Sequence, residues 1–211
     1  MNGGNFNFRI EEEEKKRYYG VGSFLLEIIK VFVLALIIIV PIRVFLFQPF
    51  FVQGASMEPN FDDGDYLIIN ELGYKKTSVG FNGIHFFTVD SFKNLQRGDV
   101  IVFRFPKDPQ KYFIKRIVGL PEEKMEIREG KVVIYNKENP SGFILDENSY
   151  LPMDLETATE LVERIGENEY FVMGDNRPFS SDSRSWGLLD KDKIVGKVLI
   201  RAWPMNKAAI Y

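Results

Sequence analysis

Apolar residues form one long block near the N-terminus and then many short runs. The block extends from Phe24 to Phe47, and Val31–Ile42 carries no charged residue. This uncharged core is shorter than the roughly 20 residues that span a bilayer. Lys30 and Arg43 lengthen it, because their long side chains can place their charges at opposite interfaces. We therefore expect one transmembrane helix over residues 24–43. A cleaved export signal is the main alternative, and a buried core helix is the weakest.

The charges before this block predict its orientation. Arg9, Lys15, Lys16 and Arg17 precede it. Acidic residues count little in the positive-inside rule, and a long C-terminal domain is translocated largely regardless of its charge. Residues 1–23 should therefore form a cytoplasmic tail. The rest of the chain after the helix should lie outside the cytoplasm, held by a single pass through the inner (cytoplasmic) membrane.

Beyond Pro49 the pattern changes to short β-rich runs separated by turn residues such as Asp63-Gly64 and Glu129-Gly130. This predicts a mainly β, antiparallel domain formed by residues 44–135 and 170–211. Residues 136–169 are more polar and rich in turns, so they are expected to be a small insertion or cap. Within them, Leu155–Ile165 is expected to form a short helix. The expected strands are Tyr66–Ile69, Val100–Phe105, Phe113–Val118, Lys131–Tyr135 and Tyr170–Met173.

Composition limits the possible functions of this β domain. Hydrophobic residues make up 45% of the 211 residues and aromatic residues 14%, which favours a well-packed globular part. The net charge of −3 gives no electrostatic reason to propose nucleic acid as a partner. With no cysteine and a single histidine, a zinc or iron site is nearly excluded, although carboxylates can still bind a hard cation. We therefore expect neither a metal nor another cofactor.

The first candidate for chemistry is a serine with an unusual base. Ser56 lies in Phe50–Pro59 (FFVQGASMEP), shortly after the apolar block. The only histidine, His85, is far from it in sequence and is expected to be a surface or loop residue. Lys115 is the alternative base. Strand alternation places it on one face with Phe113 and Ile117, where apolar neighbours should lower its pKa and supply a neutral amine near neutral pH.

A third segment combines turn residues with opposite charges. It runs from Gly174 to Arg184 (GDNRPFSSDSR) and is followed by Trp186-Gly187. Taken alone, it is an Asx-rich turn with Asp–Arg pairs. The Ser56 motif alone is also often only a turn, so neither segment by itself identifies a function.

Taken in this order after a membrane anchor, the three segments resemble the bacterial type I signal peptidases. The resemblance runs from about Phe24 to Trp203 and includes Arg97–Phe103 (RGDVIVF). It implies an antiparallel β-sheet catalytic domain of the signal-peptidase type, in a compact form with one anchor and a small inserted cap. It also implies a Ser/Lys peptidase without a cofactor. In that reading Ser56 is the nucleophile and Lys115 the general base. Ser180 hydrogen-bonds and orients the lysine amine, and Asp182 and Arg184 form an ion pair that holds the loop.

The chain departs from the family pattern at two positions. Gly54 stands where some members carry a serine that helps to bind the oxyanion, so the oxyanion hole should rest on the backbone N–H of Ser56 and a further donor. Asn60 replaces the threonine that usually follows the proline. Both side chains can hydrogen-bond locally, so this change affects packing rather than chemistry.

The resemblance also implies the substrate. Export signals end in small residues at positions −1 and −3 before the cut, so exported preproteins are the expected partners, together with the lipid bilayer. The pockets for these small residues would be walled by Phe50, Val52, Phe113 and Ile114. The substrate would add as an extended strand between the Ser56 and Lys115 segments. The aromatic side chains of Phe45, Phe47, Phe50 and Phe51 either face lipid or pack in the core, and the sequence leaves both readings open.

Two alternatives remain. A self-cleaving Ser/Lys regulator would share the pair, but it needs a DNA-binding module, and the N-terminal region is apolar rather than a basic helix-turn-helix. A non-catalytic, membrane-tethered β module could bind peptides by strand addition. The presence of both Ser56 and Lys115 within their motifs speaks against it.

Overall fold

The computed structural model describes residues 20–45, 47–81, 84–153 and 155–211, without the side chains of residues 41–47, 77–84, 86 and 87. The basic tail residues Arg9 to Arg17 and the side chains of Phe45 and Phe47 lie outside the described part, so their predicted roles stay predictions. The chain divides into two compact units, residues 1–40 and residues 41–211.

The apolar block forms a helix, α1 (Val21–Phe45), which is longer than the predicted span at both ends. Its stretch Val21–Val40 is apolar and long enough to cross a membrane, and none of that stretch is buried. Large side chains such as Phe24, Phe32 and Ile37 are each more than half exposed. A core helix would bury such side chains, so α1 does not behave as one.

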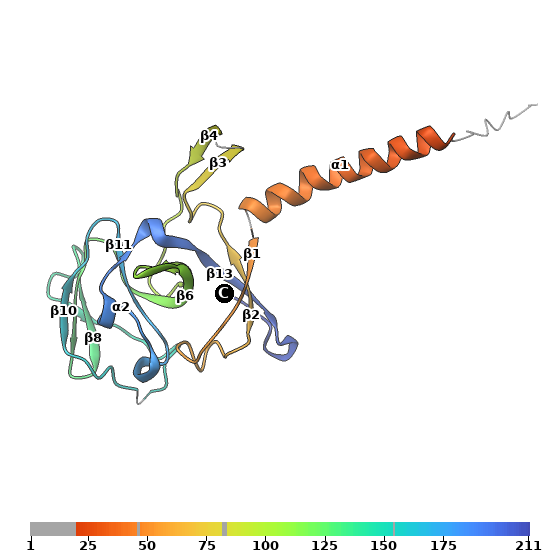
Figure 1. Cartoon of the computed structure of the whole chain (residues 1–211). Coiled ribbons are helices and arrows are strands. Elements are labelled where there is room, and N and C mark those ends of the chain that lie inside the picture. Colours follow the sequence, from red (N-terminus) through yellow and green to blue (C-terminus); the bar gives the residue numbers. More distant parts are fainter. Residues whose placement is uncertain (1–19, 46, 82–83, 154) are drawn as a thin grey trace, which may run out of the picture. The chain divides into compact units, whose positions relative to one another are not determined.

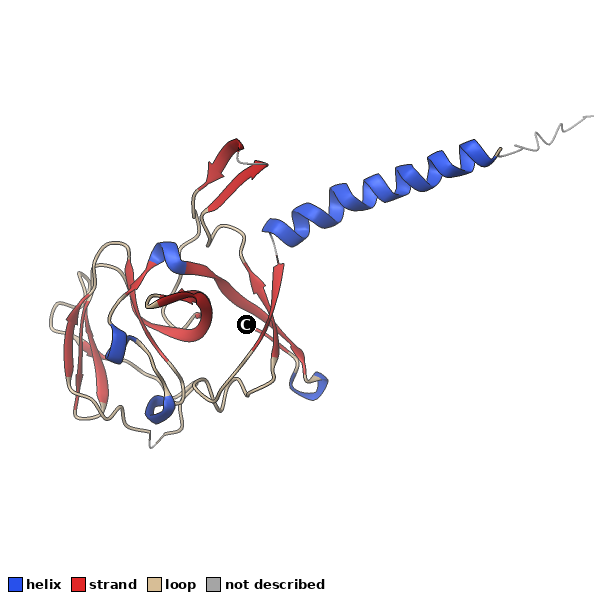
Figure 2. Cartoon of the chain, viewed as in Figure 1, coloured by secondary structure: helices blue, strands red, loops and turns tan. Residues whose placement is uncertain are grey.

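The main sheet confirms the predicted mainly β, antiparallel fold (Figures 1 and 2). All of its strand pairs are antiparallel, and each predicted strand lies within an observed one. In pairing order it contains β1 (Phe47–Phe51), β2 (Tyr66–Asn70), β13 (Ile194–Trp203), β5 (Val100–Phe105), β6 (Asp108–Gly119), β11 (Glu169–Met173) and β12 (Leu189–Asp190), with β14 (Ala209–Ile210) beside β13.

Two smaller sheets complete the β unit. One contains, in order, β10 (Leu161–Arg164), β7 (Lys124–Arg128), β8 (Lys131–Tyr135) and β9 (Phe143–Ile144). It packs on the main sheet through a shared core in which Met125 and Ile134 join Val118 and Phe171. The other is a hairpin of β3 (Thr77–Phe81) and β4 (Ile84–Val89). The predicted cap boundaries at residues 136 and 169 stay a prediction, while the four-stranded sheet itself extends from Lys124 to Arg164.

The prediction of a helix over Leu155–Ile165 is wrong. Residues 155–160 are irregular, and Leu161–Arg164 is strand β10, paired with β7. The exposure of these four residues alternates with a period of two, as in a strand with one face on the core. Thr157 is hydrogen-bonded outside this segment, since its N–H donates to the carbonyl of Gly130. Tertiary pairing therefore decides the structure of this segment over its weak helical spacing.

Four short helices lie in the connections between β11 and β14. They are η1 (Arg177–Phe179), α2 (Ser183–Trp186), η2 (Lys191–Lys193) and η3 (Met205–Lys207). Two of them, η1 and α2, follow β11 directly and lie in the predicted charged loop. That loop is therefore a compact folded segment beside the main sheet.

Candidate active site

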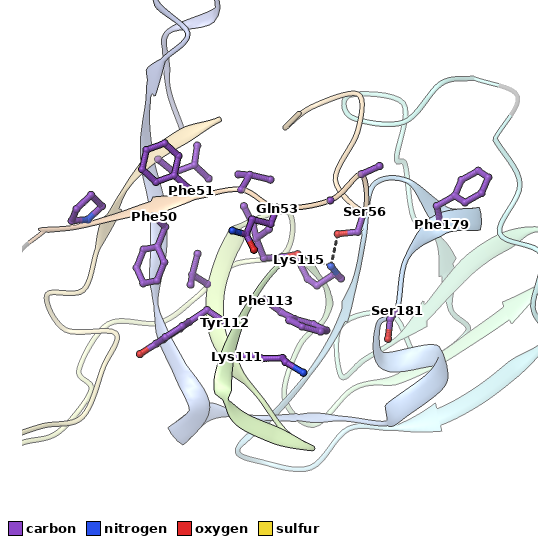
Figure 3. Close-up of a pocket in the computed structure, with 17 residues that line it drawn as sticks. Phe50, Phe51, Gln53, Ser56, Lys111, Tyr112, Phe113, Lys115, Phe179 and Ser181 are labelled. Carbon is purple, nitrogen blue, oxygen red and sulfur yellow. Dashed lines mark hydrogen bonds between the residues drawn. The ribbon is translucent and has the colours of Figure 1, made fainter. Parts of the chain in front are cut away.

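A cleft of about 730 Å³ lies between β1 and β6 (Figure 3). In the sheet these two strands are separated by β2, β13 and β5. The sheet nevertheless curves far enough to bring them face to face, because the rings of Phe50 on β1 and Tyr112 on β6 are 5.2 Å apart. Side chains on both strands therefore line one groove.

Both walls of this groove present unpaired strand edges. Within the described residues β1 pairs only with β2. Along β6, β11 pairs with residues 116–119, whereas residue 108 and residues 112–115 pair, among the described strands, only with β5. Unpaired backbone N–H and C=O groups are a template for adding a further strand. An extended peptide can therefore lie in the groove and hydrogen-bond to either edge.

Ser56 lies on a tight turn that follows β1. The next residue, Met57, and Phe61 are fully buried, and the backbone N–H of Phe61 donates to the Met57 carbonyl at 2.9 Å. Because Met57 and Phe61 are anchored in the core, the Ser56 hydroxyl points to the other side, into the cleft (Figure 3). The turn thus fixes the position of a reactive group at the open side of the core.

Lys115 reaches this hydroxyl from β6. Its Nζ lies 2.7 Å from Ser56 Oγ and donates to the Ile114 carbonyl at 2.8 Å. The lysine is only 3% exposed. Burial removes water from the charged form and lowers its pKa to about 8, although the carboxylates of Asp182 and Asp175 act in the opposite direction. A sizeable fraction of neutral amine is therefore available near neutral pH, within reach of the serine proton.

The backbone N–H groups of Ser56 and Gly54 differ in whether they already have an acceptor. Within the described part of the chain, the backbone N–H of Ser56 has no acceptor. The N–H of Gly54 donates to Asp63 Oδ1 at 2.7 Å, so this amide is already occupied. Gly54 adopts a φ of +84°, a conformation that favours glycine. The glycine therefore serves the turn rather than supplying a donor through its own amide.

The loop after β11 is hydrogen-bonded directly to the turn that carries Ser56. The N–H of Asn176 donates to the Ser56 carbonyl at 3.1 Å, and its side chain donates to the Ala55 carbonyl at 2.9 Å. Gly174 lies so close that a Cβ there would sit 2.3 Å from the Ser56 carbonyl oxygen and 2.2 Å from Ser180 Oγ. Only glycine fits this approach, so the motif glycine sets the spacing between loop and turn.

Asp182 and Arg184 form the predicted ion pair. Two parallel hydrogen bonds of 2.8 Å join the guanidinium to the carboxylate, and Asp182 is fully buried. Burial alone raises the pKa of Asp182, but Arg184 and the Gly174 amide outweigh it and keep the pKa below its ordinary value. Arg184 also donates to the Arg177 carbonyl at 2.7 Å. The pair thus connects both ends of the loop.

A second buried pair, not predicted from the sequence, lies on the other side of Lys115. Arg116 donates to both oxygens of Asp175, at 2.8 and 2.6 Å. Asn60 joins them, since its side-chain amide donates to Asp175 at 2.9 Å and to the Tyr150 carbonyl at 2.6 Å. The asparagine that departs from the family pattern therefore links the Ser56 turn, the loop and the Tyr150 segment.

Ser180 lies beside Gly174 in the loop. Its buried hydroxyl acts on the Asp182 carboxylate, whose pKa it helps to lower, and the predicted hydrogen bond to Lys115 is not found among the described residues. The lysine amine instead contacts Ser56 and the Ile114 carbonyl. The role of Ser180 in orienting Lys115 therefore stays a prediction.

All four predicted pocket residues, Phe50, Val52, Phe113 and Ile114, line the cleft. Phe50 and Ile114 pack against the core cluster that contains Val52, whereas Phe113 stacks on Phe105 with ring centroids 4.3 Å apart. His85 lies on β4, is exposed, and contacts Thr88 at 2.8 Å, outside the cleft lining. The motifs did not predict the other lining residues, which include Gln53, Leu67, Lys111, Tyr112, Phe179 and Ser181.

Comparison with known proteins identifies the family. A family model described as signal peptidase, peptidase S26, matches residues 25–203. Signal peptidase IB from Staphylococcus aureus strain Mu50 is 30% identical over 194 residues, which cover 87% of this chain and 92% of that protein. A probable signal peptidase I-2 from Synechocystis is 30% identical over 207 residues, which cover 95% and 84%. The chain belongs to the bacterial type I signal peptidases.

A crystal structure of a signal peptidase I from Enterococcus faecalis is 29% identical to this chain. It covers 51% of this chain and 98% of the crystallised chain, with a TM-score of 0.41. As a type I signal peptidase, this chain is a peptidase that removes signal peptides, and preproteins are its substrates. The family resemblance stated from the motifs is therefore confirmed.

Proposed function

We propose that this signal peptidase works through a dyad of Ser56 and Lys115. The observation that supports it is the 2.7 Å contact between the serine hydroxyl and a buried lysine amine whose pKa is lowered to about 8. When the amine is neutral, its lone pair can accept the hydroxyl proton while an N–H remains bonded to the Ile114 carbonyl. No histidine or carboxylate is then needed as a base.

The reaction proceeds in two stages. Ser56 Oγ forms a bond to the scissile carbonyl carbon while Lys115 Nζ takes its proton, and the free Ser56 N–H binds the resulting oxyanion. Lys115 then gives the proton to the departing amine as the C–N bond breaks, which leaves an acyl-enzyme. A water molecule attacks this ester and transfers a proton to Lys115, which returns it to the serine oxygen.

Specificity for small residues at −1 and −3 follows from the walls of the cleft. Phe50, Val52, Phe113 and Ile114 are held by the core or by aromatic stacking, so they cannot easily move aside for a large side chain. Overfilling such a packed site costs roughly 1–3 kcal/mol. The substrate adds as a strand between the two unpaired edges of β1 and β6.

The exposed apolar helix α1 anchors the enzyme in the inner membrane. A single pass places the N-terminal tail in the cytoplasm and the β unit outside it, in agreement with the basic residues before the helix. This arrangement also places the catalytic unit on the side where an exported preprotein emerges.

The central experiment compares wild type with Ser56→Ala in cleavage of a preprotein by the detergent-solubilised full chain. We expect the variant to lose at least about 10⁴-fold in kcat, since removing a catalytic serine has effects of that order or larger. Its thermal unfolding should match wild type. Ser149→Ala, which changes an exposed serine outside the cleft, is the matched control and should cleave normally. Near-wild-type activity of Ser56→Ala would sink the serine assignment.

The pocket assignment is tested by two preproteins that differ only at −1, with alanine in one and leucine in the other. Wild type should prefer alanine by about ten- to a hundredfold in kcat/KM. Ile114→Ala should reduce this preference because it enlarges the pocket, whereas Ile144→Ala, at an exposed site on β9, should not. Equal cleavage of both preproteins by wild type would show that these walls do not select substrates.

A further inference from the structure

The cleft continues past Ser56, away from the pockets predicted for the signal peptide. Phe50 and Tyr112 lie on one side of Ser56, and Phe179 and Ser181 lie on the other (Figure 3). Phe179 is 77% exposed although it lines the cleft. The groove therefore has an aromatic side chain on the side of Ser56 that lies away from the predicted pockets.

Phe179 is connected to the nucleophile by a short chain of hydrogen bonds. Its N–H donates to the Asn176 carbonyl at 3.0 Å, and the N–H of Asn176 donates to the Ser56 carbonyl at 3.1 Å. The Asn176 side chain donates to the Ala55 carbonyl as well. The backbone that carries the phenyl ring is therefore held at a fixed distance from the reacting hydroxyl.

The rest of η1 reinforces this position. Arg177 is buried, and its guanidinium contacts Glu147 and Thr157. Pro178 has a restricted φ, which removes backbone freedom next to Phe179. A side chain that binds against the ring thus meets a surface whose backbone is already ordered, and less entropy is lost on binding.

We propose that Phe179 is a specificity-determining residue for the mature side of the substrate, where it contacts an apolar or aromatic side chain at +1 or +2. The proposal rests on the proposed function, because it assumes that the bond is cut at Ser56. An extended strand advances about 3.3 Å per residue, so the first two residues after the cut lie within about 7 Å of the scissile bond. Preproteins whose mature part begins with an apolar residue at that position are the preferred class.

The experiment uses preproteins with alanine at −1 and with alanine, leucine, phenylalanine or aspartate at +1, and a second set varied at +2. The detergent-solubilised full chain is compared with Phe179→Ala. In one of the two sets, wild type should cut the leucine and phenylalanine substrates about three- to tenfold better in kcat/KM than the aspartate substrate, as expected for an aromatic contact. Phe179→Ala should bring this ratio close to one.

Phe92→Ala is the matched control, because Phe92 is also exposed but lies outside the cleft lining, and it should keep the wild-type ratio. An unchanged ratio in Phe179→Ala, in both sets, would overturn the proposal. So would an equal loss on all substrates that appears in lipid vesicles and not in detergent, since that pattern indicates a lipid contact. Failure of wild type to cut any preprotein would instead overturn the proposed function.

Discussion

The proposed dyad and the loop of residues 174–184 place buried polar groups in opposite environments. Lys115 is buried, has no ion-pair partner among the described carboxylates, and has its pKa lowered to about 8. In residues 174–184 each charged side chain has a close partner of opposite charge: Asp175 with Arg116, Arg177 with Glu147, and Asp182 with Arg184. The loop gains rigidity from this compensation, whereas the dyad gains reactivity from lacking it.

This difference predicts that substitutions in the dyad and in the loop have different costs. A buried charge without a direct partner destabilises the folded state, so removing it should improve stability while abolishing activity. Removing one member of a compensated pair leaves a new buried charge, so it should reduce both. Measurements of activity and unfolding on the same variants separate the two cases.

The largest effects are expected at Lys115. Lys115→Arg should be inactive, because a guanidinium stays protonated and cannot act as a base. Lys115→Met should also be inactive but more stable at pH 7. The difference between a pKa of about 8 in the folded chain and the ordinary 10.5 corresponds to roughly 3 kcal/mol. This penalty is fully present below about pH 8 and disappears as pH rises towards 10.5, so the gain in Tm should vanish there too.

Preprotein cleavage and thermal unfolding at pH 7 and near pH 10.5 measure these effects. An active Lys115→Arg would show that another group removes the serine proton. A Lys115→Met variant that is less stable than wild type at pH 7 would show that the lysine is compensated after all, and the contrast with the loop would fail.

The next effect concerns the buried pair of Asp182 and Arg184. Asp182→Asn and Arg184→Gln should each destabilise the fold by about 3–5 kcal/mol and reduce activity, since each leaves a buried charge alone. A double-mutant cycle should give a coupling well above the ~1 kcal/mol typical of exposed pairs. The exposed pair of Lys137 and Glu122 is the matched control and should couple weakly. Additive effects at Asp182 and Arg184 would mean that the two charges act independently.

The sequence predicted the features of this comparison that depend on local pattern. The strands around Lys115 follow from short apolar β-rich runs bounded by turn residues, and Asp182 and Arg184 are only two residues apart. Arg116 and Asp175 are 59 residues apart, so only the pairing of β6 with β11 brings them together. The missed cleft residue Phe179 is similar: its exposure and direction depend on the anchoring of η1 by Arg177 to Glu147, which no local pattern encodes.

The segment Leu155–Ile165 shows that a local pattern can also predict the wrong structure. Its spacing of Thr157 and Leu161 suits a helix, but pairing with β7 makes Leu161–Arg164 a strand. Ser180 is a different case, because its position follows from the motif while its hydrogen bond does not. A hydroxyl–amine hydrogen bond depends on side-chain rotamers, which the motif does not specify.

The smallest expected effect is a shift of the pH–rate profile between wild type and loop variants, and it is measured against the wild-type profile. In the proposed mechanism the neutral amine of Lys115 is the active form, so kcat/KM should fall about tenfold per pH unit below about pH 8 and level off above it. Rates of preprotein cleavage between pH 5 and 10 give the profile. A rate that stays flat down to pH ~5 would contradict lysine as the base.

Substitutions at Asp182 and Arg184 should shift the acid limb of this pH profile in opposite directions. The negative charge of Asp182 raises the pKa of Lys115, so Asp182→Asn should shift the acid limb to lower pH. Arg184→Gln leaves the same carboxylate without its neutralising partner and should shift the acid limb to higher pH. Both variants lose stability, but a loop that acted only as a scaffold would lower the plateau without moving the limb. Opposite shifts in the two variants, measured against wild type in the same buffers, would show that the compensated loop sets the electrostatic environment of the uncompensated lysine.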